Sequence, residues 1–198
     1  MALVPLSKLE AVNEMLSVIG ESPINSLSGS LTQDASMAEN LLDRTSREVQ
    51  MTRWSFNVED RFPLAKDGSG FIQLPTDCLF CDVDPEYSSA SLDVVVRGTR
   101  LYDRTNQTYV FTTSPIYVEL TRFLDFETLP EAARWFITVK ASRKFQDRVQ
   151  GSQTDHFYTA QDEQDARAGM RQHELRSGDQ TIFSNYNVAR TLRRTPRW

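Results

Sequence analysis

The sequence predicts an α+β fold in which helices from the two ends of the chain form one bundle and a β region is inserted between them. Apolar residues recur at helical spacing near both ends of the chain. The middle of the chain has short apolar runs separated by Pro, Gly, Asp and Ser, which is typical of strands and turns. We therefore divide the chain into N-terminal helices of the bundle (1–59), a β-rich insertion (60–127), C-terminal helices of the bundle (128–177) and a C-terminal extended arm (178–198).

The composition is that of one folded domain, or at most two, and it excludes several classes of protein. The chain has 198 residues, of which 39% are hydrophobic and 25% are charged. Its net charge is −5, so no overall basic field draws it onto DNA or an anionic membrane. No apolar run approaches the ~20 residues of a membrane-spanning helix. The N-terminus lacks a signal-peptide pattern, so we expect synthesis in the cytoplasm.

The first helix is expected to begin after Ser7 and to end near Gly20. Ser7 and Glu10 have the spacing of a capping box, in which each side chain accepts a hydrogen bond from a free backbone N–H group. Gly20, followed by Pro23, is typical of a helix end. The residues that recur at helical spacing in between are Leu9, Val12, Leu16 and Ile19.

A second helix is expected to run from a cap at Thr32 or Asp34 to about Arg53. Its apolar stripe comprises Ala38, Leu42, Thr45 and Val49. The apolar residues that follow alternate instead, which predicts a direct change from helix to strand. They are Trp54, Phe56 and Val58.

The inserted region is expected to contain short strands joined by tight turns. Pro fixes φ and Gly permits positive φ, so the expected turn sites are Asp84-Pro85, Arg97-Gly98 and Ser114-Pro115. The apolar runs that predict strands are 71–74, 79–83, 92–96, 109–111 and 116–124.

Helix returns after the insertion and continues almost to the arm. Thr128 and Glu131 have the spacing of a second capping box and Pro130 suits a first turn, so a long helix is expected up to Gly151. A last helix is expected at about 154–176. Its few, small apolar residues can bury only a thin stripe, so most of its surface faces solvent or another subunit.

Three aromatic residues are expected to anchor the bundle to the β region. Trp54 stands where the helical and strand periods meet. Trp135 and Phe136 stand on the richest apolar face of the third helix. We predict that all three side chains are buried in the core.

The sequence gives little support for metal, redox or nucleophilic chemistry. Cys78 and Cys81 form a lone C-x-x-C in a strand-like run, where residues i and i+3 point to opposite faces, so both are expected to be small buried residues. His156 and His173 are expected to be solvated residues of a polar helix. No P-loop, G-x-S-x-G elbow or dinucleotide-binding motif is present. We therefore expect no cofactor, no metal and no enzymatic activity.

Paired carboxylates leave one catalytic function open, because a glycosidase needs only two acids at a suitable separation. The candidate residues are Glu59, Asp60, Glu119, Asp125 and Glu127. With 27 acidic residues in the chain, some neighbouring pairs arise by chance.

The C-terminal arm differs in composition from the rest of the chain. It has no acidic residue after Asp179 and it ends in a tryptophan. Arg and Trp often carry the binding energy of interfaces, which favours an arm that docks on an acidic partner over a solvated terminus. The residues expected to make this contact are Tyr186, Arg190, Arg193, Arg194, Arg197 and Trp198.

Several short segments match a known family in the same order along the chain. In the first half they are Leu9-Glu10-Ala11-Val12-Asn13, Ile19-Gly20-Glu21-Ser22-Pro23 and Arg53-Trp54-Ser55-Phe56-Asn57. In the second half they are Tyr102-Asp103-Arg104-Thr105, Leu129-Pro130-Glu131 and Val139-Lys140-Ala141-Ser142-Arg143. From about residue 8 to 170 the chain resembles the tail tubular protein A family of short-tailed, T7-like phages. After about residue 178 the match is poor.

The resemblance implies a structural adaptor of the short tail of the virion, in a ring that is dodecameric in the family. Such a ring joins the portal to the tail nozzle and gates and conducts DNA during ejection. The implied partners are the portal protein, a nozzle protein similar to tail tubular protein B, further copies of this chain, and genomic DNA that passes without sequence-specific binding. No membrane is implied. The arm residues would then form the portal interface.

Two other functions stay open beside the adaptor. One is a tail-associated peptidoglycan or polysaccharide hydrolase that uses paired carboxylates in a cleft. The other is a DNA-binding module, which requires a contiguous basic face.

Overall fold

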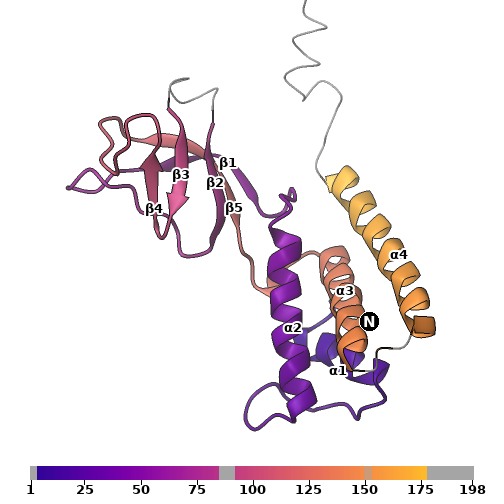
Figure 1. Cartoon of the computed structure of the whole chain (residues 1–198). Coiled ribbons are helices and arrows are strands. Elements are labelled where there is room, and N and C mark those ends of the chain that lie inside the picture. Colours follow the sequence, from indigo (N-terminus) through magenta and orange to yellow (C-terminus); the bar gives the residue numbers. More distant parts are fainter. Residues whose placement is uncertain (1–3, 85–91, 150, 152, 178–198) are drawn as a thin grey trace, which may run out of the picture.

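The structure is a computed structural model that describes residues 4–84, 92–149, 151 and 153–177. It has the α+β fold that the sequence predicts, with helices at both ends of the described chain and strands between them (Figure 1). The elements are α1 (Lys8–Val18), α2 (Gln33–Gln50), β1 (Val58–Leu64), β2 (Cys78–Val83), β3 (Val94–Arg97), β4 (Arg100–Asp103), β5 (Ile116–Arg122), the 3-10 helix η1 (Phe126–Thr128), α3 (Glu131–Val149) and α4 (Gln153–Ser177). The arm expected at 178–198 lies outside the described residues.

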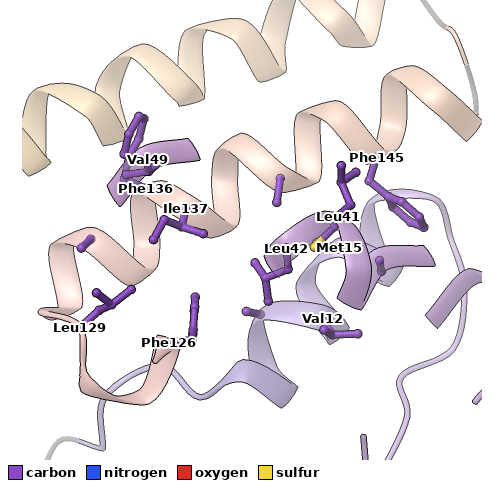
Figure 2. Close-up of a cluster of buried hydrophobic side chains, with 14 of the residues drawn as sticks. Val12, Met15, Leu41, Leu42, Val49, Phe126, Leu129, Phe136, Ile137 and Phe145 are labelled. Carbon is purple, nitrogen blue, oxygen red and sulfur yellow. The ribbon is translucent and has the colours of Figure 1, made fainter. Parts of the chain in front are cut away.

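The helical core is built around α3, which packs against α1, α2 and α4. Figure 2 shows the large apolar side chains of α1, α2 and α3 filling the space between these helices. They include Val12, Met15, Leu42, Phe136, Ile137 and Phe145. Of the described side chains of α4, only Ala166 and Met170 are buried in this core. The prediction that the last helix buries a thin stripe is confirmed.

The two N-terminal helices begin as the sequence predicts. Ser7 N–H donates to Glu10 Oε2 at 2.8 Å and Glu10 N–H donates to Ser7 Oγ at 3.2 Å, which completes the capping box. Thr32 caps α2, because its hydroxyl oxygen accepts from Ala35 N–H at 3.3 Å. The predicted stripe of α2 is buried, at Ala38, Leu42, Thr45 and Val49.

The start of α3 differs from the prediction, because Thr128 and Glu131 do not cap each other. Thr128 belongs to η1, where its hydroxyl donates to Asp125 O at 2.7 Å. The Glu131 carboxylate instead accepts from Leu6 N–H at 2.9 Å. The acid that was expected to cap its own helix therefore holds the N-terminal segment of the chain against that helix.

The segment after α2 is a turn, so the predicted direct change to a strand is wrong. β1 begins only at Val58. Trp54 and Phe56 pack against the helical core and lie nearly parallel, with ring centroids 6.5 Å apart. Trp54 Nε1 also donates to Val49 O at 2.8 Å. Trp54 and Phe56 alternate in the sequence because both side chains of this turn pack against the bundle, and not because they share one face of a strand.

The inserted region contains two antiparallel sheets, with strand orders β1-β5-β2 and β3-β4. Three predicted runs (79–83, 92–96 and 116–124) coincide largely with β2, β3 and β5. The run 71–74 forms only isolated bridges, 109–111 is not a strand, and β4 was not predicted. Gly98 turns the β3-β4 hairpin with a φ of 64°, as expected for a turn that favours glycine. These strands enclose their own apolar core, centred on Ile72, Leu101, Val118 and Leu120.

Two buried amide side chains join the sheet to the bundle. Gln50, at the end of α2, exchanges hydrogen bonds with the backbone of Leu124, accepting from its N–H at 2.7 Å and donating to its carbonyl at 2.9 Å. Asn57 donates to Gln50 O at 2.8 Å and to Arg122 O at 3.0 Å. The chain leaves the bundle at residues 50–57 and returns at 122–124, so these amides tie the outgoing segment to the returning one.

Trp135 does not lie in the core, contrary to the prediction. Its side chain is 47% exposed, whereas that of Phe136 is 4% exposed and Trp54 is partly buried. Consecutive helical residues differ by about 100° around the axis, so the turn that directs Phe136 into the core directs Trp135 to its side. The expectation holds for two of the three aromatic residues.

We expect Gln50→Met to destabilise the fold, because an apolar side chain of similar size leaves the N–H and C=O of Leu124 without their partner. Each unsatisfied buried group costs roughly 1–3 kcal/mol in the free energy of unfolding. Urea denaturation measures this loss, with the exposed Gln164→Met in α4 as the matched control. Equal stability of the two variants would contradict the role of the junction.

We expect Phe136→Ala to lower the free energy of unfolding by about 3–5 kcal/mol, because it opens a cavity in the helical core. Trp135→Ala removes a side chain that is already half exposed, so its loss should be clearly smaller. Thermal denaturation of both variants tests the ranking. A larger loss for Trp135→Ala would show that this indole supports the core after all.

Candidate assembly surface

An apolar groove of about 510 Å³ lies between α1, α3 and α4. The exposed Trp135 of α3 forms part of its wall, together with Val139 of α3 and Val18 of α1. Ala166 and Met170 of α4 complete the apolar lining. A half-exposed tryptophan in an apolar groove is typical of a surface that binds another molecule.

The groove has an acidic rim. Glu14 comes from α1, and Asp162 and Asp165 come from α4. All three residues are exposed, and within the described part of the chain none of them forms an ion pair. Arg143 also lines the groove, but its guanidinium is 2.6 Å from Glu163 Oε2 and is therefore neutralised within the chain. The charge left on the rim is negative.

A second depression, of about 290 Å³, lies on the other side of α4, against α3 and the end of α2. Arg167 and Arg171 of α4 line it beside Trp54 and Lys140. Because the two arginines are four residues apart, they share one face of the helix. Both are exposed, and neither has an ion-pair partner among the described residues. The charge left on this side of α4 is positive.

The lysines near this depression are neutralised by an acid of α2. Lys140 Nζ lies 2.8 Å from Glu48 Oε1, and Lys144 also pairs with the Glu48 carboxylate. The hydrogen bonds from Lys140 and Lys144 lower the pKa of Glu48 below its ordinary value. These ion pairs fasten α2 to α3, so the cations that stay free on this side are the two arginines of α4.

Gly169 lies on the groove side of α4, within a helix where glycine costs about 1 kcal/mol relative to alanine. A β-carbon built at this position would meet no atom of the chain within 4 Å. Packing inside the subunit therefore does not explain why this position lacks a side chain.

The cysteine pair is unsuited to thiolate chemistry. Cys81 is buried in β2 and Cys78 is partly buried at the start of the same strand, and both are free thiols. Burial raises the pKa of Cys81 to about 12 and also raises that of Cys78. At neutral pH both groups are thus protonated. The expectation of small residues packed in the sheet is confirmed for Cys81 and holds in part for Cys78.

Three of the candidate acids serve as partners of arginines or of the backbone. Glu59 Oε1 lies 3.0 Å from Arg122 Nη1, and the Glu119 carboxylate pairs with the guanidinium of Arg53. Glu127 accepts from Lys8 N–H at 2.9 Å. Asp125 precedes η1 and Asp60 is exposed in β1. None of the five acids lines the apolar groove or the depression on the other side of α4.

The remaining predicted residues are placed as follows. His173 is half-buried in α4, and the side chain of His156 lies outside the described part of the structure. Within the described residues, no three His, Cys, Asp or Glu side chains are grouped so as to hold a metal ion. No described helix is long and apolar enough to cross a membrane. The predicted contact residues of the arm also lie outside the description, namely Tyr186, Arg190, Arg193, Arg194, Arg197 and Trp198.

Sequence reasoning missed the groove and both charged sides of α4. It treated Trp135 as a core residue, and it predicted the thin apolar stripe of α4 without assigning the charges of that helix to separate sides. The signal that could have located them is the spacing of Ala166 and Met170, because these buried residues fix which sides of the helix carry each charge.

The exposed aromatic groove and the unpaired charges on α4 are typical of a protein that works within an assembly. The chain belongs to the tail tubular protein family, whose model, described as "Tail tubular protein", matches residues 9–180. It is also 29% identical over 193 residues to the tail tubular protein A of Klebsiella phage KP34, which covers 96% of this chain and 97% of that protein. The predicted family is confirmed, and the chain is a structural protein of a phage tail, hence of the virion.

Proposed function

We propose that the chain is the adaptor subunit of a short phage tail, which forms a ring between the portal and the tail nozzle. The observation that carries this proposal is the match to a tail tubular protein A along nearly the full length of both chains. The match covers 96% of this chain and 97% of that protein. The ring has twelve subunits, the number that the family resemblance implies, and each subunit is made in the host cytoplasm.

The shape of the subunit supports a role as a connector. Figure 1 shows the strands extending from one end of the helical bundle. The bundle and the strands have separate apolar cores, tied together by the buried amides of Gln50 and Asn57. The bundle suits the wall of a ring, and the projecting strands suit contact with the next component of the tail.

The charge of the subunit supports a conduit for DNA rather than a DNA-binding module. The net charge of −5 repels a phosphate backbone that carries one negative charge per about 1.7 Å of duplex. A ring of such subunits lets the genome pass without holding it, and no step of that passage requires recognition of a base sequence. The same ring gates the channel before ejection.

The portal contact is assigned to the C-terminal arm. Arginines pair with carboxylates through two hydrogen bonds, while their stems and an indole cover apolar surface. The arm has four arginines at 190–197 and a terminal tryptophan. Twelve such arms engaged together gain affinity from multivalency that one arm lacks.

Electron microscopy of the purified chain mixed with portal protein tests this function. We expect rings stacked on portals. Without portal, we expect sedimentation at micromolar concentration to show a monomer or small oligomer, because the exposed surface of α4 is polar and provides only a weak lateral contact. Portals that stay bare at saturating subunit would contradict the adaptor function, and a stable dodecamer without portal would contradict the templated assembly.

Truncation after Gly178 tests the arm. We expect the melting temperature to stay nearly unchanged and attachment to portals to be lost, because the truncation spares both apolar cores and removes the arginines and Trp198. A control variant with only Arg190, Arg193, Arg194 and Arg197 changed to Ser separates charge from length. Undiminished binding of the truncated chain would place the portal contact on the helices.

A further inference from the structure

We infer that neighbouring subunits contact each other head to tail through the two charged sides of α4. The acidic rim of the Trp135 groove on one subunit receives the Arg167 and Arg171 side of α4 on a second copy of this chain. The inference rests on the proposed ring, because it names the lateral contact by which that ring closes.

Charge complementarity identifies the second copy as the occupant of the groove. Asp162 and Asp165 face the groove, whereas Arg167 and Arg171 face the depression on the other side of the same helix. None of these four side chains forms an ion pair among the described residues, so their charges are available to a partner. Each subunit thus presents a negative side and a positive side, each of which fits the opposite side of an identical subunit.

The placement of these charges disfavours a symmetric dimer through the groove. A two-fold contact centred on the groove would oppose Asp162 and Asp165 to their own copies. A contact between two different surfaces adds each subunit to the next in the same sense and closes when the rotation per subunit completes a circle. The opposite signs on the two sides of α4 therefore fit the symmetry of an adaptor ring.

Gly169 supports the groove as the receiving surface independently of charge. It lies beside Trp135 on the groove side of α4, and a β-carbon there would meet nothing within the subunit. The absence of a side chain is explained if an atom of the neighbour approaches the backbone at this point. The indole of Trp135, which is exposed in the single subunit, would then be buried by the neighbouring subunit.

The weak anchoring of α4 is consistent with this role. Its described core contacts are Ala166 and Met170, and Leu175 is 70% exposed. Ser55 N–H and its hydroxyl donate to the Glu174 carboxylate at 2.7 and 2.9 Å, which fixes the end of the helix. The helix is thus held in place along one narrow line, and its two flanks stay free for neighbours.

A pair of charge-reversal variants tests the contact. Variant A carries Arg167→Glu and Arg171→Glu, so both of its sides are acidic. Variant B carries Asp162→Arg and Asp165→Arg, so both of its sides are basic. We expect each variant alone to self-associate at least about tenfold more weakly than the wild type, because like charges now meet. We expect an equal mixture to associate at least as well as the wild type, since A and B can alternate.

Sedimentation velocity in about 10 mM salt, where the Debye length is about 30 Å, measures this association without the portal. The control variant C carries Arg44→Glu and Arg148→Glu, which gives the same charge change as variant A on the exposed surface of α2 and α3. Variant C alone should self-associate like the wild type, because both charged sides of its α4 are unchanged. Weakening of C to the same extent as A would mean that net charge alone drives the association and would overturn the inference.

A substitution at Gly169 tests the groove without changing charge. We expect Gly169→Leu to keep or raise the melting temperature, because the position opens onto empty space and leucine favours a helix more than glycine does. We expect the same substitution to weaken self-association by about tenfold or more. Unchanged association of this variant would overturn the groove as the receiving surface. A mixture of A and B that stays monomeric would also overturn the lateral contact. That result is expected if residues 178–198 of the same chain, and not a second copy, occupy the groove.

The portal assay separates this inference from the adaptor function. If wild-type subunits form rings on portals but the mixture of A and B does not associate, the adaptor function is supported and the lateral contact is overturned. Association of A with B while portals stay bare supports the lateral contact and overturns the adaptor function.

Discussion

The junction formed by the buried amides of Gln50 and Asn57 is the constraint on which the rest of the structure depends. A chain that leaves a helical bundle to build a separate sheet must cross the boundary twice, and the backbone groups at the crossing lie away from both regular structures. Gln50 satisfies both backbone groups of Leu124, and Asn57 satisfies the carbonyl groups of Gln50 and Arg122. Because each amide has a donor and an acceptor end, the bonds also fix the position of the outgoing segment against the returning one.

Helix α3 contacts different parts of the molecule on its different sides. Phe136 and Ile137 face the core that the helix shares with α1 and α2. Trp135, one position earlier, lies beside α4 in the groove. Helix α3 packs on three neighbours, and α1, α2 and α3 together supply most of the buried side chains of the bundle. Among its described residues α4 adds only Ala166 and Met170 to this core, so most of its described surface stays exposed.

The sequence predicts the elements whose signals are local. The capping box of Ser7 and Glu10 and the stripe of α2 depend only on neighbours along the chain, and both are present. The failures occur where a distant partner replaces a local one. Glu131 binds the N–H of Leu6 instead of capping its own helix, and Trp54 binds Val49 O and the bundle instead of entering a strand. No spacing rule contains these partners, because tertiary packing selects them. β4 is the exception, because it pairs with β3 across the short local turn at Gly98.

The charged sides of α4 show why the candidate surface was harder to predict than the fold. In the sequence, the acids at 162–165 and the arginines at 167–171 are close neighbours and read as a mixed, solvated helix. They separate onto different sides only when the rotation of the helix is known. Ala166 and Met170 fix this rotation by packing against α3, and residues four apart then follow one line along the helix. Burial of two residues is thus sufficient to place the unpaired acids Asp162 and Asp165 and the unpaired arginines Arg167 and Arg171 on different sides of the helix, whereas Glu163 lies on the arginine side and is paired with Arg143. Helix α4 can therefore bury few residues and still carry unpaired charges of opposite sign on its two sides. The few buried residues only have to fix the rotation of the helix, and this rotation determines which side each charge occupies.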